Sequence, residues 1–299
     1  MKSLIVGMGF GQLYKDILTK AGHIVTTVDP DPMKNADFAT VEDAIDDHGF
    51  FDTVNICTPN FLHDSIARLV APHAKIVFVE KPGLATAIEW ETLLSDFPDT
   101  RFMMVKNNQY RDNILEIRDQ ANNSNLVELL WMNKDRVPNP GTWFTTKSKA
   151  FGGVSRDLMP HLLSFFTFIE PNFAEAVVVC KGSNRNWELK DLTTSDYGTV
   201  QADGVYDVDD DCSFGFGYND RAWSLNANWK TDKESEQCVS FSSPSKQKIT
   251  IELGLCPEEA YATMVATAIS NMDNDVFWID QATQDTWIHY MIDSLKDNK

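Results

Sequence analysis

An acid and a lysine stand side by side where an apolar run ends. Residues 76–79 are typical of a buried strand, and Glu80-Lys81-Pro82 follows them directly. A strand that ends this way carries a carboxylate and an ammonium group to its carboxyl edge, which is where ligands bind in open α/β sheets. Taken alone, the same pair is also compatible with a strand end exposed to solvent.

A second pair lies in residues 153–169, for which the apolar pattern predicts one long helix. Asp157 and His161 are four residues apart, so they share a face of that helix. A carboxylate one turn from an imidazole can orient the ring and stabilise its protonated form. Oxidation of an alcohol by NAD needs a base for the hydroxyl proton, and His161 suits that role. The alternative is a surface or structural pair.

The start of the chain indicates a dinucleotide. The apolar residues 4–6 run into Gly7-Met8-Gly9-Phe10-Gly11-Gln12, a strand entering a glycine-rich turn. Glycines there permit a tight turn and let backbone amides approach a pyrophosphate at a helix N-terminus. Gly7 and Gly9 fit this pattern, whereas Gly11 comes one residue before the usual third position. A plain glycine turn is the alternative.

Two other predicted strands end in polar residues. Asp29 follows the second strand, where a carboxylate would accept hydrogen bonds from ribose hydroxyls and repel a 2′-phosphate. We therefore expect NAD as the cofactor, with NADP possible. The alternative is that Asp29 is a turn residue, because aspartate beside two prolines is typical of a turn. Thr58-Pro59-Asn60 follows the third strand and would line the crevice beside the nicotinamide ribose, unless Asn60 is a helix cap. We expect His63 to be a helix residue and not a catalyst.

These residues lie within a pattern of elements that predicts an α/β fold. Strand and helix patterns alternate over residues 1–108, which indicates a Rossmann dinucleotide-binding domain with a parallel sheet. Residues 109–299 read as an α+β domain with a large, mostly antiparallel sheet, because strand-like runs follow one another over 175–253 with short turns between them. Two amphipathic helices end the chain.

Composition excludes several classes of protein. Hydrophobic residues make up 43% and charged residues 23% of the chain, as in ordinary globular proteins. The net charge of −18 argues against nucleic acid or an anionic membrane as a partner. The chain contains no long apolar run or signal-peptide core. Its five cysteines form no CxxC pair, so we expect reduced thiols, no metal site and a cytoplasmic protein.

Together the motifs resemble those of the glucose–fructose oxidoreductase and inositol dehydrogenase (Gfo/Idh/MocA) family. The resemblance covers most of the chain. It rests on the glycine turn, Thr58-Pro59-Asn60 with His63, Glu80-Lys81-Pro82, residues 107–111, Pro140-Gly141-Thr142-Trp143, Gly152-Gly153, and Asp157 with His161. The chain departs from the family pattern at Phe144, where a basic residue is frequent, and at Ser164, where an acid is common.

The resemblance implies an NAD(P)-dependent oxidoreductase that transfers a hydride between nicotinamide and a secondary alcohol or carbonyl of a sugar, cyclitol or nucleotide-sugar. Lys81 would hydrogen-bond the reacting oxygen and His161 would be the general acid or base, supported by Asp157. The active site would lie between the domains, and the C-terminal sheet would form a homodimer or homotetramer. The implied cofactor-binding residues are Gly7, Gly9, Phe10, Gly11, Asp29, Thr58, Pro59, Asn60, His63, Glu80 and Lys81; the substrate-binding candidates are Tyr110, Arg111, Arg136, Trp143, Asp157 and His161.

Two other functions stay open at this point. A biliverdin-reductase-like enzyme is similar in fold but has less need of a lysine and histidine pair. A non-catalytic dinucleotide-binding regulator should have lost Lys81 or His161, and both are present.

Overall fold

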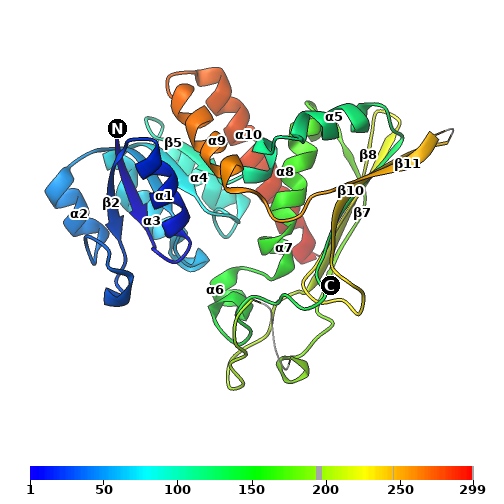
Figure 1. Cartoon of the computed structure of the whole chain (residues 1–299), viewed down its shortest axis with the longest axis horizontal. Helices are drawn as coiled ribbons and strands as arrows, with labels where there is room; N and C mark the ends of the chain where they lie inside the picture. Colours follow the sequence, from blue (N-terminus) through cyan, green and yellow to red (C-terminus); the bar gives the residue numbers. More distant parts are fainter. Residues whose placement is uncertain (193–196, 245, 298–299) are drawn as a thin grey trace. The chain divides into compact units, whose positions relative to one another are not determined.

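The computed structural model describes residues 1–192, 197–244 and 246–297. The chain forms two compact units (Figure 1). The first unit comprises Met1–Asn107 and Pro257–Tyr290, and the second comprises Asn108–Cys256 and the segment from Met291 onward. The first boundary falls near the residue expected from the sequence. Residues 257–290, in contrast, return to the first unit, although the sequence assigned them to the C-terminal domain.

Five parallel strands form the sheet of the first unit, in the order β2-β1-β3-β4-β5. The strands β3 and β4 are buried on both faces over most of their length, which is the pattern of a parallel sheet covered on both sides. The strand order reverses between β1 and β3, so the crevice at their carboxyl ends is the expected ligand site. The strands are β1 (Lys2–Val6), β2 (Ile24–Val28), β3 (Phe51–Ile56), β4 (Ala74–Val79) and β5 (Arg101–Met104); the helices are α1 (Gly11–Lys20), α2 (Val41–His48), α3 (His63–Val70), α4 (Ala87–Asp96), α9 (Glu258–Ser270) and α10 (Asp275–Asp293, whose last residues belong to the second unit).

The second unit is built on a six-stranded sheet in the order β11-β10-β6-β9-β8-β7. Every neighbouring pair is antiparallel except β6 with β9. Buried and half-buried residues alternate along β6, so one face of the sheet is in the core. The strands are β6 (Leu126–Met132), β7 (Val177–Asn184), β8 (Asp211–Tyr218), β9 (Arg221–Asn228), β10 (Glu236–Ser243) and β11 (Lys246–Glu252); the helices are α5 (Ile114–Asn122), α6 (Lys147–Ala150), α7 (Val154–Asp157) and α8 (Met159–Ile169).

The helix expected over residues 153–169 is interrupted. It forms α7 and α8, with Leu158 between them. Pro160 lies in the first turn of α8. A proline has no N–H to donate and its ring crowds the carbonyl four residues earlier, so the regular helix cannot continue through it. Asp157 and His161 therefore lie on two consecutive helices.

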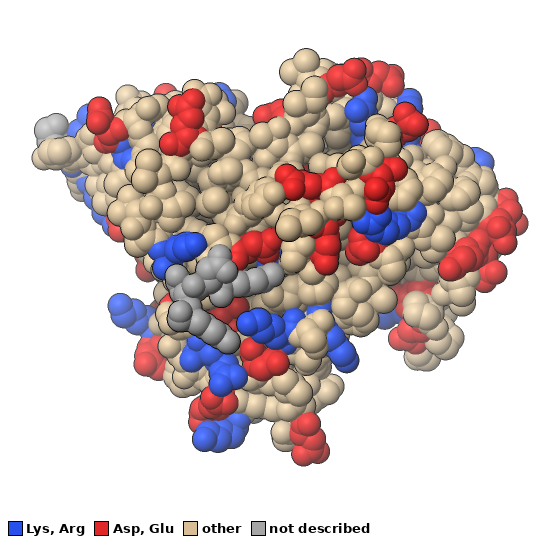
Figure 2. Space-filling model, turned by 180° about the vertical axis from the view of Figure 1, so that it is seen from behind, with Lys and Arg blue, Asp and Glu red and all other residues tan. Residues whose placement is uncertain are grey.

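These two sheets confirm the predicted fold class, an N-terminal Rossmann-type sheet with a C-terminal, mostly antiparallel sheet. Among the described residues, no helix is both long and apolar enough to cross a membrane. Acidic side chains are spread among basic ones over the face shown in Figure 2, in keeping with the net charge of −18.

Candidate functional site

The three glycines of the first turn have three different surroundings. Gly7 has a φ of +93°, and a Cβ there would lie 2.8 Å from the backbone carbon of Cys57. A Cβ on Gly11 would lie 2.7 Å from the Ile5 side chain, so this glycine allows α1 to approach the sheet. Gly9 has open space around its Cα. Tight turn, open approach and helix packing are the roles of the three glycines in a dinucleotide fold, and the shifted third glycine fills the packing role here.

The helix that follows this turn begins without a cap. Phe10 stands at the N-cap position of α1 and makes no side-chain capping hydrogen bond. No acidic residue lies in the first turn of this ten-residue helix. Its backbone N–H groups and the positive end of its dipole therefore face no carboxylate of the first turn, which suits an anion such as a pyrophosphate. Phe10 itself is 40% exposed.

Asp29 is tied to the glycine turn. One carboxylate oxygen, Oδ2, accepts a hydrogen bond from the Met8 N–H at 2.7 Å, and Oδ1 accepts one from the Asp31 N–H at 2.9 Å. The acid therefore holds the backbone of the turn, which agrees with the turn role considered for it. Each oxygen keeps a second lone pair, so the same carboxylate can also accept from a ligand.

The loop after β3 contains a buried polar atom that suits a ligand. The Thr58 hydroxyl oxygen is buried and has no hydrogen-bond partner within the described part of the chain. Such an atom is rare in native proteins and calls for a partner. Pro59 occupies the N-cap position of the short 3-10 helix Asn60–Leu62, and neither this helix nor α3 has a side-chain cap, so Asn60 does not serve as the helix cap considered above.

His63 lies in the interior and not on the crevice. Its side chain is fully buried, with Nδ1 2.7 Å from the Gly83 carbonyl oxygen and Nε2 2.9 Å from the Thr58 carbonyl oxygen. The ring thus joins the loops that follow β3 and β4. Burial lowers the pKa of His63, although its two carbonyl neighbours oppose that effect. No part of this ring is exposed to a ligand.

Glu80 and Lys81 stand at the carboxyl end of β4, as the sequence predicts. The Glu80 N–H donates to Ile56 of the adjacent strand at 3.0 Å, so this end is aligned with that of β3. The Tyr14 hydroxyl donates to Glu80 Oε1 at 2.9 Å. Burial raises the pKa of Glu80, while the charge of Lys81 and the Tyr14 hydrogen bond act in the opposite direction. The Lys81–Pro82 peptide bond is cis.

In the second unit, Asp157 and His161 are each held by a tryptophan. The Trp229 indole N–H donates to Asp157 Oδ2 at 2.8 Å. The His161 ring is stacked on Trp131, with ring centroids 5.6 Å apart and planes inclined by 22°. His161 is 9% exposed, so it is nearly buried. The two tryptophans lie on β6 and at the end of β9, which places the pair against the six-stranded sheet.

A single aspartate fixes the start of α7. Asp209 Oδ1 accepts from the Gly153 N–H and the Ser155 hydroxyl, both at 2.9 Å, and Oδ2 accepts from the Ser155 N–H at 2.8 Å. The Asp209 carbonyl also accepts from the Val154 N–H at 2.9 Å. A carboxylate that binds the free N–H groups at a helix start stabilises that helix and its direction. Asp209 therefore sets the entry to the segment that carries Asp157.

Two of the predicted substrate-binding residues are arginines with different surroundings. Arg111 is 5% exposed and donates to Asn108 and to the carbonyls of Leu253 and Gly254, at 2.6 to 3.0 Å. It links the start of this unit to the end of β11. Arg136 is half-buried, lies over the Tyr197 ring at 5.0 Å, and its N–H donates to the Trp229 carbonyl.

The aromatic candidates Tyr110 and Trp143 are half-buried. Trp143 is stacked on Phe144, with centroids 3.8 Å apart. Trp229 binds both Arg136 and Asp157, since its carbonyl accepts from the Arg136 N–H and its indole N–H donates to Asp157.

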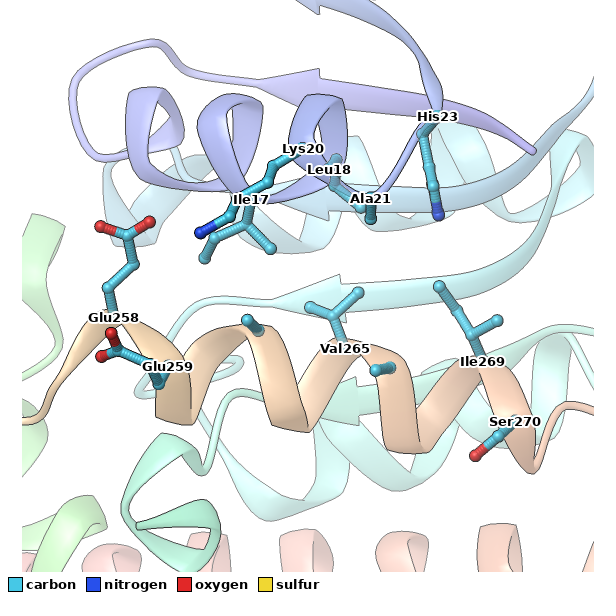
Figure 3. Close-up of a pocket in the computed structure, with 12 residues that line it drawn as sticks. Ile17, Leu18, Lys20, Ala21, His23, Glu258, Glu259, Val265, Ile269 and Ser270 are labelled. Carbon is cyan, nitrogen blue, oxygen red and sulfur yellow. The ribbon is translucent and has the colours of Figure 1, made fainter. Parts of the chain in front are cut away.

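An apolar groove of about 430 Å³ lies elsewhere in the first unit, between α1 and α9 (Figure 3). Ile17, Leu18 and Ala21 line one wall, and Val265 and Ile269 line the other. None of its lining residues belongs to the glycine turn or to the ends of β3 and β4. The groove is therefore separate from the candidate cofactor site.

Sequence reasoning missed the residues that support the site. These are Tyr14, Trp131, Asp209 and Trp229. Asp209 lies in an acidic run just before β8, and such a run does not indicate a contact with the start of α7, which lies 54 to 56 positions earlier in the sequence. The tryptophans differ in no local feature from core tryptophans, so their partners are visible only in the folded chain.

Comparison with known proteins gives the same fold. No family model matches the chain. A protein of Amycolatopsis mediterranei (strain S699), named as the oxidoreductase subunit of a UDP-kanosamine synthase, is 26% identical over 185 residues, which cover 56% of this chain and 51% of that protein. The matched region thus spans about half the length of this relative.

Solved structures match over nearly the whole chain. GenD2 from gentamicin A biosynthesis, in complex with NAD, has a TM-score of 0.74 at 16% identity and covers 100% of this chain and 95% of its own. Levoglucosan dehydrogenase with NADH and levoglucosan has a TM-score of 0.71 at 16% identity (99% and 96%). A structure described as a myo-inositol dehydrogenase, from Sinorhizobium meliloti 1021, has a TM-score of 0.75 at 17% identity (100% and 98%).

At these identities the likeness shows the fold. This fold agrees with the one that the resemblance drawn from the motifs implies. The chain has the two-sheet fold of these three structures.

Proposed function

We propose that the chain is an NAD-dependent oxidoreductase acting on a secondary alcohol or carbonyl of a sugar, cyclitol or nucleotide-sugar. The observation that carries the proposal is the edge formed by β1, β3 and β4. There a glycine turn with open space at Gly9 and an uncapped helix start is followed, at adjacent strand ends, by a Thr58 hydroxyl that has no partner among the described residues, and by Lys81. The relatives' bound NAD and NADH and their sugar substrates support the same reading.

The residues of the first unit fit a bound dinucleotide. The backbone around Gly7, Gly9 and Phe10 and the start of α1 would hold the pyrophosphate. Thr58 would meet the nicotinamide half through its free hydroxyl, whereas His63 would act indirectly by holding the Thr58 and Gly83 loops together. Bound NAD would supply the hydride acceptor for alcohol oxidation, or the donor when reduced.

The chain's own side chains would handle the substrate oxygen and its proton. Lys81 donates a hydrogen bond to the reacting oxygen and stabilises negative charge there. His161 takes the hydroxyl proton during oxidation and returns it during reduction. Asp157, oriented by Trp229, supports His161 or binds a neighbouring hydroxyl. Because Trp131 covers one face of the imidazole, proton exchange takes place at its edge.

The test is a hydride-transfer assay. Purified protein with NAD would be mixed with myo-inositol, levoglucosan, UDP-glucose and UDP-N-acetylglucosamine, and NADH formation would be followed at its near-ultraviolet absorbance. Turnover of at least one compound, lost in both Lys81→Ala and His161→Ala, is the expected result. Tight NADH binding with no turnover of any sugar or nucleotide-sugar would favour the non-catalytic regulator.

We also propose NAD in preference to NADP, on the position of Asp29. Asp29→Asn keeps oxygen and nitrogen atoms near the Met8 N–H but removes the charge that repels a 2′-phosphate. We expect the ratio of NADPH to NADH affinity to rise about tenfold in this variant, since such a contact is worth about 1.4 kcal/mol. An unchanged ratio would leave Asp29 with its turn role alone.

We also propose an oligomeric state and a cellular location for the protein. The face of the six-stranded sheet that carries the half-buried Leu130 and Met132 would pair two copies into a dimer or tetramer. Light scattering after gel filtration decides the oligomeric number. A cytoplasmic location is supported by cysteine usage, since the five cysteines are odd in number and form no CxxC pair.

A further inference from the structure

One peptide group close to Lys81 is held on both sides by histidines. The Gly83 carbonyl oxygen lies 2.7 Å from His63 Nδ1, and the N–H of the same peptide, on Leu84, donates to His289 Nε2 at 3.1 Å. Both rings are fully buried. His63 begins α3 and His289 is near the end of α10, so residues more than two hundred positions apart meet at this peptide.

The state of His289 follows from its contacts. Its Nε2 accepts from an amide and so carries no proton. Its Nδ1 lies 2.6 Å from the Asp285 carbonyl oxygen, to which it must donate. The ring is stacked on Trp90 with centroids 4.9 Å apart and planes inclined by 18°. His289 is therefore neutral, in a single tautomer and a single orientation.

The helix that carries His289 is itself anchored beside β5. Asp285 forms a fully buried ion pair with Lys106, and its Oδ2 accepts from the Met104 N–H at 2.9 Å. Burial raises the pKa of Asp285, and the Lys106 charge opposes that rise. One stretch of α10 thus contacts the ends of two neighbouring strands. Asp285 binds the end of β5, and His289 binds the loop after β4.

The Gly83–Leu84 peptide directly follows the turn that carries Lys81. The Gly83 N–H donates to the Glu80 carbonyl at 3.0 Å, so Lys81 and Pro82 are the central residues of a β-turn. A turn has few internal contacts, and the direction of its central side chains depends on what holds its ends. Here β4 holds one end, and the histidine pair holds the other.

We propose that His289 is a positioning residue, which sets the direction of the Lys81 ammonium group by fixing the Gly83–Leu84 peptide. The proposal rests on the proposed function, in which Lys81 binds the reacting oxygen. It gives α10 a part in catalysis, although none of the proposed substrate-binding residues lies on that helix.

Two substitutions separate this role from a purely structural one. His289→Gln keeps an oxygen acceptor for the Leu84 N–H, whereas His289→Leu has similar volume and no acceptor. If the leucine variant does not fold, His289→Asn replaces it, because the shorter amide does not reach Leu84. His23→Leu is the matched control, since it removes a histidine contact, with the Ser3 hydroxyl, elsewhere in the same unit.

The first readout is turnover with the compound that is active in the sugar panel. We expect His289→Leu to lower kcat about 10- to 100-fold with NADH affinity changed less than about threefold, because small misplacements of a catalytic group cost this much. His289→Gln should recover kcat to within about threefold of the parent. In a Lys81→Ala background, His289→Leu should cost less than about twofold, since the two residues act through one interaction.

The second readout needs no substrate. Lys81 is half-buried, so loosening its turn should speed its reaction with trinitrobenzenesulfonate, measured by peptide mass spectrometry, about threefold or more in His289→Leu and not in His289→Gln or His23→Leu. An unchanged labelling rate in His289→Leu, or equal losses of kcat in the leucine and glutamine variants, would overturn the proposal. The proposal would also be overturned if His289→Leu lowered kcat as much in the Lys81→Ala background as in the parent protein.

The two proposals fail in different ways. Full turnover by Lys81→Ala, or none by the parent protein, would refute the proposed function. In that case the labelling comparison still decides whether His289 directs the Lys81 side chain.

Discussion

The glycine turn of the first unit and the Asp157–His161 segment of the second are held by different kinds of contact. Backbone hydrogen bonds of the parallel sheet fix the turn, as from the Gly7 N–H to the Val28 carbonyl at 2.8 Å. The Asp157–His161 segment is fixed by individual side chains, namely Asp209 at its start and the two tryptophans along it. The first arrangement should be sensitive to an added Cβ at a crowded glycine such as Gly7, whereas the second should respond to the loss of single polar atoms.

The largest expected effect is on turnover, and it should be shared by both regions. Lys81→Ala and His161→Ala should each lower kcat about 10²- to 10⁴-fold, because each removes a group that acts on the substrate oxygen or its proton. NADH affinity, measured by titration, should stay within about threefold of the parent. If either variant keeps parental turnover, that residue has no catalytic role.

The next effect concerns the backbone-held turn. Gly7→Ala forces a side chain onto a φ of +93° and against the Cys57 backbone, so we expect a loss of about 2–4 kcal/mol in the free energy of unfolding. Gly9→Ala is the matched change, since its Cβ meets open space. It should unfold like the parent in urea while binding NADH more weakly. Equal destabilisation by both changes would contradict the distinction.

The Asp157–His161 segment should be sensitive to the loss of a single hydrogen bond. Trp229→Phe removes the indole N–H that binds Asp157, and we expect kcat to fall about 5- to 20-fold, as for a bond to a charged group. Trp223→Phe is the control, because its indole N–H binds the Glu170 carboxylate at 2.8 Å in the same unit. The two variants should lose similar stability, with kcat lowered only in Trp229→Phe. A loss of kcat in both would show a general effect of destabilisation.

The smallest effect is on stability at the end of β4. Because burial raises the pKa of Glu80 in the folded chain above its ordinary value of 4.5, the folded protein binds this proton more tightly than the unfolded chain. The free energy of unfolding therefore falls as pH rises from the ordinary value through the raised one. Glu80→Gln removes this loss, so its urea midpoint should exceed that of the parent at pH 8 and match it below the ordinary pKa.

Glu91→Gln is the control for that change. Glu91 also accepts a tyrosine hydroxyl, from Tyr290 at 2.7 Å, but its side chain is exposed. This substitution should have the same small effect at both pH values. A pH-independent difference for Glu80→Gln would show that the Glu80 carboxylate costs no stability when ionised.

Which features could be predicted from the sequence depends on the same difference between backbone-held and side-chain-held regions. The glycine turn, Asp29 and Glu80-Lys81 were predictable because strand ends and turns leave local patterns, and parallel strands bring those ends to one edge. The third glycine differed from the usual spacing, and only the contact with Ile5 identified its role. Asp157 and His161 were identified as a pair, but the break at Leu158 and the supporting tryptophans were not.

The remaining features depend on contacts between distant parts of the chain. Arg111 was a candidate for the substrate because it follows a motif, yet its guanidinium binds carbonyls at the end of β11. The return of α10 to the first unit depends on the buried pair of Lys106 and Asp285. Nothing in the local pattern of either residue predicts a partner 179 positions away.

The most direct test of the account is a titration of the purified protein with NADH and NADPH, followed by energy transfer from tryptophan to nicotinamide. The account predicts saturable NADH binding in the range of about 1 µM to 1 mM, weaker binding of NADPH, and reduced NADH binding in Gly9→Ala. Binding of neither nucleotide would contradict it, because the glycine turn and the uncapped start of α1 would then hold no dinucleotide.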